Sequence, residues 1–175
     1  AWFGGGSDGA TNEQLQVEGI GPKMPLGKWT HVAFVRNGHF VRLYLNGELA
    51  GEGGGFTLPF QDTATYEFGG FNAGGSTGGF TGRFCEIGLW QQAFTAEEVV
   101  QAMYARPAGT ERMLLGYWPM DDGEGDSLRN IKVGGVSAQP VETTGNFDWV
   151  PCGNIPALDG TMVFPPPPGT LILAK

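Results

Sequence analysis

The most constraining feature of this sequence is the stretch 27–51, in which two Asn-Gly pairs separate apolar runs. The runs 29–35 and 40–45 flank Asn37-Gly38, and Asn46-Gly47 follows the second run. Asn-Gly is the dipeptide that best tolerates the positive φ angles of a tight hairpin turn. The stretch therefore predicts a three-stranded antiparallel meander with a tight turn at each pair and a short, weak third strand.

Alternation within the second run separates an apolar face from a mixed one. Successive side chains of a strand point to opposite faces, so one face carries Val41, Leu43 and Leu45. We expect this face to lie in the core. The opposite face, with its charged and aromatic side chains, is expected to be mixed.

Glycine is in excess, with 31 residues in a chain of 175, which is more than twice the usual share of about 7%. Because the glycines are scattered, they indicate many tight turns between short strands, as in an all-β sandwich. A chain of this length ordinarily forms one domain.

The second half of the chain adds one strand and one helix to this prediction. The run 80–90 predicts a strand, and the run 94–106 predicts a helix. Thr95 is placed as the N-cap, with Glu98 as its capping-box partner three residues later. Further strands are predicted at 113–118 and, more weakly, at 15–17, 56–60, 65–68, 133–138 and 147–150.

Two sequence motifs carry a family resemblance. The first consists of Lys28-Trp29-Thr30-His31-Val32-Ala33 followed by Leu43-Tyr44-Leu45-Asn46-Gly47, and the second is the run from Gly82 to Val99. Together they resemble laminin-G-like and pentraxin-like domains of the concanavalin-A-like lectin/glucanase group. The resemblance implies an all-β jelly-roll sandwich of antiparallel sheets with one short helix. It also implies a non-catalytic module, because most such domains bind glycans or proteins.

The resemblance leaves the completeness of the domain open. The strands that normally precede the first motif are absent, so we expect the domain to span 1–160, with 111–160 supplying them. The alternative is that this segment opens a second repeat. Residues 161–175 contain Pro165–Pro168 and are expected to form a proline-rich tail or linker.

Charge and hydropathy exclude two classes of partner. The net charge is −8 and the basic residues are spread out, whereas nucleic-acid binding requires clustered cations. No apolar stretch approaches the roughly 20 residues that span a bilayer, so no membrane insertion is expected. The start of the chain shows neither an initiator Met nor a signal peptide, which indicates a segment of something longer.

The two cysteines are compatible with two interpretations. A disulfide between Cys85 and Cys152 would suit a secreted module at the cell surface or outside the cell. The alternative is a buried free thiol and an unrelated loop cysteine, which leaves an intracellular assembly open.

The carboxylates Asp121, Asp122, Glu124 and Asp126 are candidate calcium ligands, because calcium takes six to eight oxygen ligands. The spacing does not match an EF-hand loop, and a solvated acidic turn is the favoured interpretation. In pentraxin-like relatives the calcium site would correspond to 69–79, which holds Asn72 and no carboxylate. This departure argues against calcium-dependent binding of the pentraxin type, and no other cofactor is expected.

Ligand contacts are assigned to residues with loop-like surroundings. The glycine-rich segment 69–79 is expected to be a loop at the rim of the sandwich, where such folds bind ligands. Phe71 and Asn72 within it, together with Trp2 and Trp149, are the candidate binding residues; the alternative for the aromatic ones is burial in the core.

Glycoside hydrolysis is disfavoured by the sequence. Such chemistry needs two carboxyl groups about 5–10 Å apart, and the strand-borne E-x-D-x-x-E motif of related glucanases is matched only at Glu86. We expect Glu86 to be a surface or sheet-end residue. His31, within the first motif, is expected to be structural.

The resulting hypothesis is a non-catalytic binding or structural interaction module whose partners are other protein chains or domains of the same assembly. The alternative is a carbohydrate-binding lectin domain of a secreted or cell-surface protein. An accessory domain of a hydrolase is the third possibility.

Overall fold

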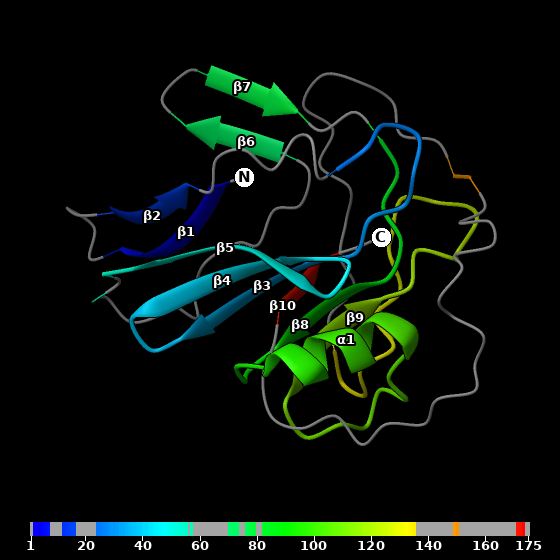
Figure 1. Cartoon of the computed structure of the whole chain (residues 1–175). Helices are drawn as coiled ribbons and strands as arrows, with labels where there is room; N and C mark the ends of the chain where they lie inside the picture. Colours follow the sequence, from blue (N-terminus) through cyan, green and yellow to red (C-terminus); the bar gives the residue numbers. More distant parts are fainter. Residues whose placement is uncertain are drawn as a thin grey trace.

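The structure is a computed structural model of the whole chain (Figure 1). It describes residues 24–55, 57, 82–135 and 149–150, together with the backbone of five strands at 2–7, 12–16, 70–73, 76–79 and 171–173.

The predicted meander is confirmed. It consists of β3 (Val32–Asn37), β4 (Phe40–Leu45) and β5 (Glu48–Gly54), paired antiparallel in that order. The third strand is longer than expected, because its ladder with β4 continues across a bulge as far as Gly54. An ion pair between Arg42 and Glu52, with Nε and Oε2 3.2 Å apart, joins the two strands within this extension.

The two turns of the meander differ from each other. Asn46 and Gly47 have φ angles of 50° and 83°, which is the type I′ turn predicted for an Asn-Gly pair. In the first turn Asn37 pairs with Phe40, so the central residues are Gly38 and His39. Only Gly38 has a positive φ angle, 58°, as in a type II′ turn. This turn therefore lies one residue later than predicted.

His31 connects the first motif to the second turn. Its backbone N–H donates to Asn46 Oδ1 at 2.9 Å, and its carbonyl oxygen accepts from the Asn46 N–H at 2.9 Å. His31 is buried, directly before β3. The two parts of the motif are therefore in contact, and the structural role expected for His31 is confirmed at its backbone.

The second half contributes β8 (Ile87–Trp90), α1 (Ala96–Tyr104) and β9 (Leu114–Trp118). The capping box is confirmed, because the Glu98 N–H donates to Thr95 Oγ1 at 3.3 Å and the Thr95 N–H donates to Glu98 Oε2 at 2.6 Å. The helix ends at Tyr104, two residues earlier than predicted. The residue that precedes a proline, here Arg106 before Pro107, disfavours helical backbone angles.

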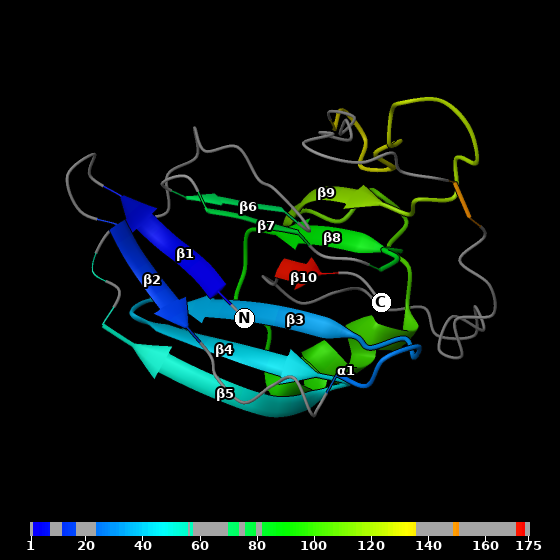
Figure 2. The ribbon, with the colours of Figure 1, turned by 90° about the horizontal axis from the view of Figure 1, so that it is seen from above.

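All these strands join one six-stranded sheet in the order β5-β4-β3-β10-β8-β9. Its fourth strand, β10 (Leu171–Leu173), comes from the segment expected to be a tail or linker. Figure 2 shows β10 in red between β3 and β8. β9, from the segment expected to complete the sandwich, is an edge strand of the same sheet.

Two hairpins lie on the opposite side of this sheet from α1 (Figures 1 and 2). One pairs β1 (Trp2–Ser7) with β2 (Asn12–Gln16), and the other pairs β6 (Gly70–Ala73) with β7 (Ser76–Gly79). The prediction of a loop at 69–79 is therefore wrong for the residues that form β6 and β7. A β-ladder uses backbone groups alone, so glycine-rich segments can still form one.

The core occupies both faces of the sheet. On the face that α1 covers, the buried cluster consists of Ala33, Val35, Tyr44, Trp90, Phe94, Val99, Leu114 and Tyr117. On the other face it consists of Phe34, Leu43 and Leu45. The predicted alternation in β4 is therefore confirmed, and Tyr44 is buried as well because the helix-side core encloses it.

Several weaker strand predictions have different outcomes. β2 confirms the strand predicted at 15–17, although it begins earlier. Residues 133–134 form a turn, and 149–150 are not in a strand, so these two predictions are wrong where they are described. The predictions at 56–60 and 65–68 lie almost entirely outside the described residues.

Candidate functional site

The candidate site begins at Glu86, the residue directly before β8. Its φ angle is 59°, in the left-handed region that non-glycine residues adopt at a cost. Glu86 is only 7% exposed. The sequence-based expectation of a surface residue is wrong, whereas its place at the end of a sheet strand is confirmed. The predicted strand 80–90 is also too long, because extended geometry stops at this residue.

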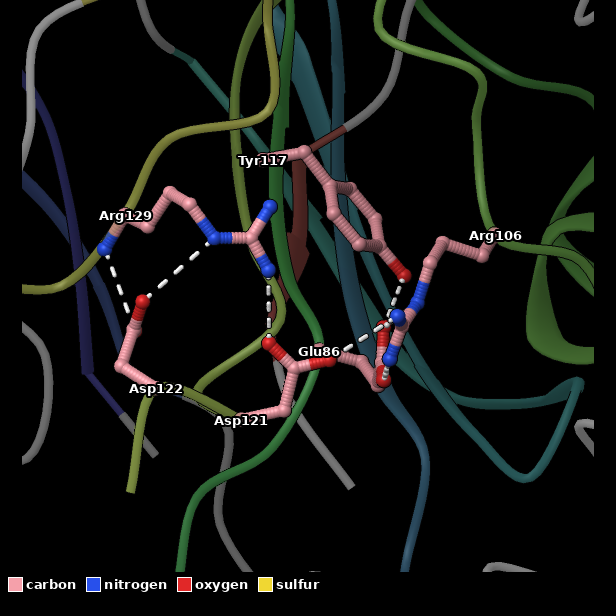
Figure 3. A network of polar contacts seen from close by, with 6 residues as sticks. All are labelled: Glu86, Arg106, Tyr117, Asp121, Asp122 and Arg129. Atoms are coloured by element: carbon pink, nitrogen blue, oxygen red, sulfur yellow. Dashed lines mark hydrogen bonds and ion pairs between the residues drawn. The ribbon is translucent and has the colours of Figure 1, made fainter. Parts of the chain in front are cut away.

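Glu86 accepts hydrogen bonds from two neighbouring side chains (Figure 3). Arg106 Nε donates to Glu86 Oε2 at 3.1 Å, and Arg106 Nη2 pairs with Glu86 Oε1. Tyr117 Oη donates to Glu86 Oε2 at 2.7 Å. The three side chains come from the residue before β8, the segment after α1 and the second half of β9. The contacts therefore join three segments at one end of the sheet.

Charged side chains continue outward from Arg106 in alternating sign. Arg106 Nη1 lies 3.0 Å from Asp121 Oδ2, and Arg129 Nη2 lies 2.9 Å from Asp121 Oδ1. Arg129 also reaches Asp122, through Nε to Oδ1 at 3.5 Å and through its backbone N–H to Oδ2 at 3.1 Å. We call Glu86, Arg106, Tyr117, Asp121, Asp122 and Arg129 the Glu86 network.

Burial and charge fix the protonation states at the inner end of the Glu86 network. Burial, reinforced by the neighbouring Glu86 carboxylate, raises the pKa of Tyr117 well above its ordinary value of 10.0. The hydrogen bond to Glu86 raises the pKa of Arg106 above its ordinary value. Tyr117 is therefore a neutral donor and Arg106 a cation throughout the physiological range.

The geometry leaves Glu86 poorly suited to act on a substrate. Each of its carboxylate oxygens already accepts from a donor of this chain. An acid or nucleophile of a glycosidase needs a second carboxyl group near the same bond, and Asp121 is itself engaged by Arg106 and Arg129. The arrangement positions chain segments and does not present a reactive group.

Asn130 holds the backbone of β9 at Tyr117, which belongs to the Glu86 network. Its Oδ1 accepts from the backbone N–H of Tyr117 at 3.0 Å and from that of Lys132 at 2.9 Å. The N–H of Ile131 donates to the Tyr117 carbonyl oxygen at 2.9 Å. Residues 130–132 therefore lie beside Tyr117 of β9, held there by one backbone and one side-chain hydrogen bond.

The acidic turn predicted as a calcium site is divided between two roles. Asp121 and Asp122 are bound to arginines, whereas Glu124 and Asp126 are exposed. Within the described parts of the chain, no group of three or more His, Cys, Asp or Glu side chains is placed to hold a metal ion. Calcium binding at this turn stays a prediction.

The predicted ligand-contact residues are described to different extents. Trp149 is half-buried and its Nε1 donates to the Gly125 carbonyl oxygen at 2.8 Å, so it lies against the acidic turn. Trp2 lies in β1, while Phe71 and Asn72 lie in β6. The prediction that these three residues lie in loops is therefore wrong. Their side chains are not among the parts that the structure describes.

Cys85 is buried and disulfide-bonded. Cys152 is the only other cysteine of the sequence, but it lies outside the described residues. The pairing of these two cysteines stays a prediction that the bonded state of Cys85 supports.

Sequence analysis missed Arg106, Tyr117 and Arg129. The first two lie 20 and 31 residues from Glu86, so no local periodicity links them to it. The one available signal was an acidic residue in an otherwise apolar run, since a buried acid requires a partner.

Among the comparisons with known proteins, the match to a protein family agrees with the sequence motifs. No curated protein and no solved structure matches the chain. Among the described residues no helix is long and apolar enough to cross a membrane. A family model of the laminin-G type, described as the concanavalin A-like lectin/glucanases superfamily, matches residues 2–100. This match covers more than half of the chain, and laminin-G-like domains commonly bind proteins or glycans. The chain therefore belongs to the concanavalin A-like lectin/glucanases superfamily.

Proposed function

We propose that this chain is a non-catalytic binding or structural interaction module of a larger protein or assembly. The observation that carries the proposal is the engagement of Glu86. Glu86 is the one position at which the chain matches the acidic motif of related glucanases. Both of its carboxylate oxygens accept hydrogen bonds from Arg106 or Tyr117. The binding partners of the module are other protein chains or domains.

Exposed apolar side chains near the edge of the sheet support a protein partner. Phe40 in β4 is 59% exposed and Leu49 in β5 is 49% exposed. Strand β5 is an edge strand of the six-stranded sheet, and such edges offer unpaired backbone groups to a partner. Single exposed apolar residues are common; here two of them accompany an edge strand of the described sheet.

The catalytic alternative is tested by hydrolysis of soluble β-glucan and xylan, with release of reducing sugar as the measurement. We expect no release above the rate without protein. The comparison uses Glu86→Gln and, as a matched control, Glu52→Gln, whose parent carboxylate pairs with Arg42 on the surface. Sugar release that Glu86→Gln abolishes and Glu52→Gln preserves would overturn the proposal.

The second candidate is a carbohydrate-binding lectin domain of a secreted or cell-surface protein. The bonded state of Cys85 favours it, because disulfides persist mainly outside the cytosol. A glycan array probed with and without calcium tests it and also tests calcium at the turn 121–126. Saturable binding to a defined glycan supports this candidate; a uniformly blank array under both conditions rejects it in favour of a protein partner.

A further inference from the structure

The fourth strand of the sheet comes from a distant part of the sequence. β10 pairs antiparallel with β3, where Leu171, Ile172 and Leu173 face Phe34, Ala33 and Val32. On its other side it pairs with β8 through Ile172 and Gly88. We call the space between β3 and β8 that β10 fills the strand slot (Figure 2).

The walls of the strand slot are also joined through described residues outside β10. The helix-side core contains Ala33 and Val35 from β3, Trp90 from β8 and Val99 from α1 in one buried cluster. Tyr117 of β9 belongs to the same cluster and is tied to Glu86 at the start of β8. Departure of β10 would therefore open the slot without separating its two sides.

β10 itself has few backbone pairs within the described sheet. It has three residues, and only Ile172 is paired on both sides. Elements with few backbone pairs open at much lower free energy than the global unfolding of a domain. An open strand slot would expose the unpaired edges of β3 and β8, and such edges readily pair with another strand.

The sequence before β10 is long enough to reach a second molecule. Residues 151–170 would span at most about 66–72 Å if fully extended. A domain of 175 residues has a radius of gyration of about 16 Å, so its diameter is smaller than this reach.

We propose that the strand slot accepts β10 from a second copy of this chain, so that copies associate by strand exchange. The inference rests on the proposed function as an interaction module and names its partner. The contacts made within one chain and between two chains are the same, so concentration decides between them. Mutual exchange gives a closed dimer, whereas one-way exchange gives an open chain of copies.

The test uses cysteines at paired register positions of different chains. Val32→Cys and Leu173→Cys, made in separate chains, are mixed and oxidised, and disulfide-linked heterodimer is measured on a non-reducing gel. The double variant V32C/L173C serves as the register control, since it can cross-link within one chain. Arg112→Cys, at an exposed turn position, replaces Leu173→Cys as the control for random collision.

We expect heterodimer that increases with protein concentration and that the mixture with Arg112→Cys lacks. Heterodimer no more abundant than in that control, together with an intramolecular cross-link in the double variant, would overturn the proposal.

A second measurement applies if the cysteine variants do not fold. Ile172→Pro removes the backbone donor of β10 and disrupts a central strand, whereas Ile172→Val preserves it. Sedimentation velocity should show loss of self-association for the first variant only; equal self-association of both would refute strand exchange. Neither result depends on sugar release, so failure of this inference is distinguishable from failure of the non-catalytic assignment.

Discussion

At the scale of single residues, Glu86 determines how the end of the sheet is held. It is buried at a strained backbone position, and its charge is matched by Arg106, whose side chain remains 41% exposed. Tyr117 supplies the remaining donor from β9. Because a buried carboxylate without partners is very unfavourable, the three residues are energetically interdependent.

Glu86→Gln should lower the free energy of unfolding by about 1–3 kcal/mol. The amide nitrogen cannot accept a hydrogen bond, so one donor loses its acceptor. The effect stays below the roughly 3–5 kcal/mol of a fully buried pair because Arg106 is partly exposed. Urea unfolding measures it. The control Glu52→Gln breaks an exposed pair and should cost at most about 1 kcal/mol; equal losses would contradict the prediction.

Tyr117 should make stability decline in strongly alkaline solution. Its pKa is raised in the folded state, so the unfolded chain loses the phenolic proton first. The stabilisation that protonated Tyr117 contributes is complete below about pH 10. It is lost as the pH rises toward the raised pKa of the folded state, with the free energy of unfolding falling by up to about 1.4 kcal/mol per pH unit.

The comparison for Tyr117 uses Tyr117→Phe and Tyr104→Phe. Tyr117→Phe should cost about 1–2 kcal/mol at neutral pH through the lost bond to Glu86. Above about pH 10 its deficit relative to the unmodified chain should shrink. Tyr104 is exposed, so Tyr104→Phe should follow the unmodified chain. Urea unfolding from pH 7 to 11 decides between these outcomes, and a constant deficit would reject the assignment.

Sequence reasoning at this scale succeeded where the contact is local. Thr95 and Glu98 are three residues apart, and both of their hydrogen bonds were predicted. The burial of Glu86 was not, because strand alternation places a residue on a face but does not say what covers that face. Its partners are contributed by segments that only the folded chain brings together.

At the scale of elements, α1 packs against the type I′ turn between β4 and β5. A Cβ atom on Gly47 would lie 2.8 Å from Val100 Cγ2, closer than real Cβ contacts. Gly47 is thus required twice, once for its φ angle of 83° and once for this close approach. The turn in the sequence motif is therefore also a docking point for the helix.

Gly47→Ala should destabilise the protein more than Gly38→Ala does. Both positions have positive φ angles, but a Cβ on Gly38 would meet nothing within 4 Å. Backbone strain should cost about 1–2 kcal/mol in each variant, and the clash should add to this at Gly47. Thermal or urea unfolding measures the difference.

The double variant G47A/V100A isolates the contact with α1. Removing the Val100 methyl groups should restore part of the loss caused by Gly47→Ala. If Val100→Ala and Gly47→Ala were simply additive, the contact would have no energetic consequence.

The elements themselves were predicted best where turn chemistry or capping was explicit. The meander and α1 follow from Asn-Gly pairs and a capping box, which act within a few residues. β6 and β7 were predicted as a loop because glycine has a weak preference for strands. That preference is overridden when two such segments pair with each other.

At the scale of the whole molecule, one sheet is assembled from three regions of the sequence. The meander forms one side, β8 and β9 form the other, and β10 lies between them. Propensity and periodicity do not specify which distant strands become neighbours. The segment that contains β10 was expected to be a tail or linker, because its central place in the sheet depends on long-range pairing.

A disulfide between Cys85 and Cys152 should stabilise the whole chain by about 2–4 kcal/mol, the typical range for a protein disulfide. Peptide mapping without reductant should recover the two cysteines in one linked fragment. Reduction should lower the melting temperature, and Cys152→Ser should reproduce that loss without further change on reduction. Recovery of separate, unlinked cysteine peptides would contradict the pairing.

The position of β10 has a consequence for the order of events in folding. Phe34 and Leu171 are paired in the sheet but lie far apart in the sequence, so their contact closes a long loop and forms slowly. During synthesis, β3, β8 and α1 all leave the ribosome before β10. Neighbouring nascent chains on one messenger RNA would then hold unfilled strand slots close to a chain that is further along in synthesis, and the β10 of that chain would fill the slot of the next.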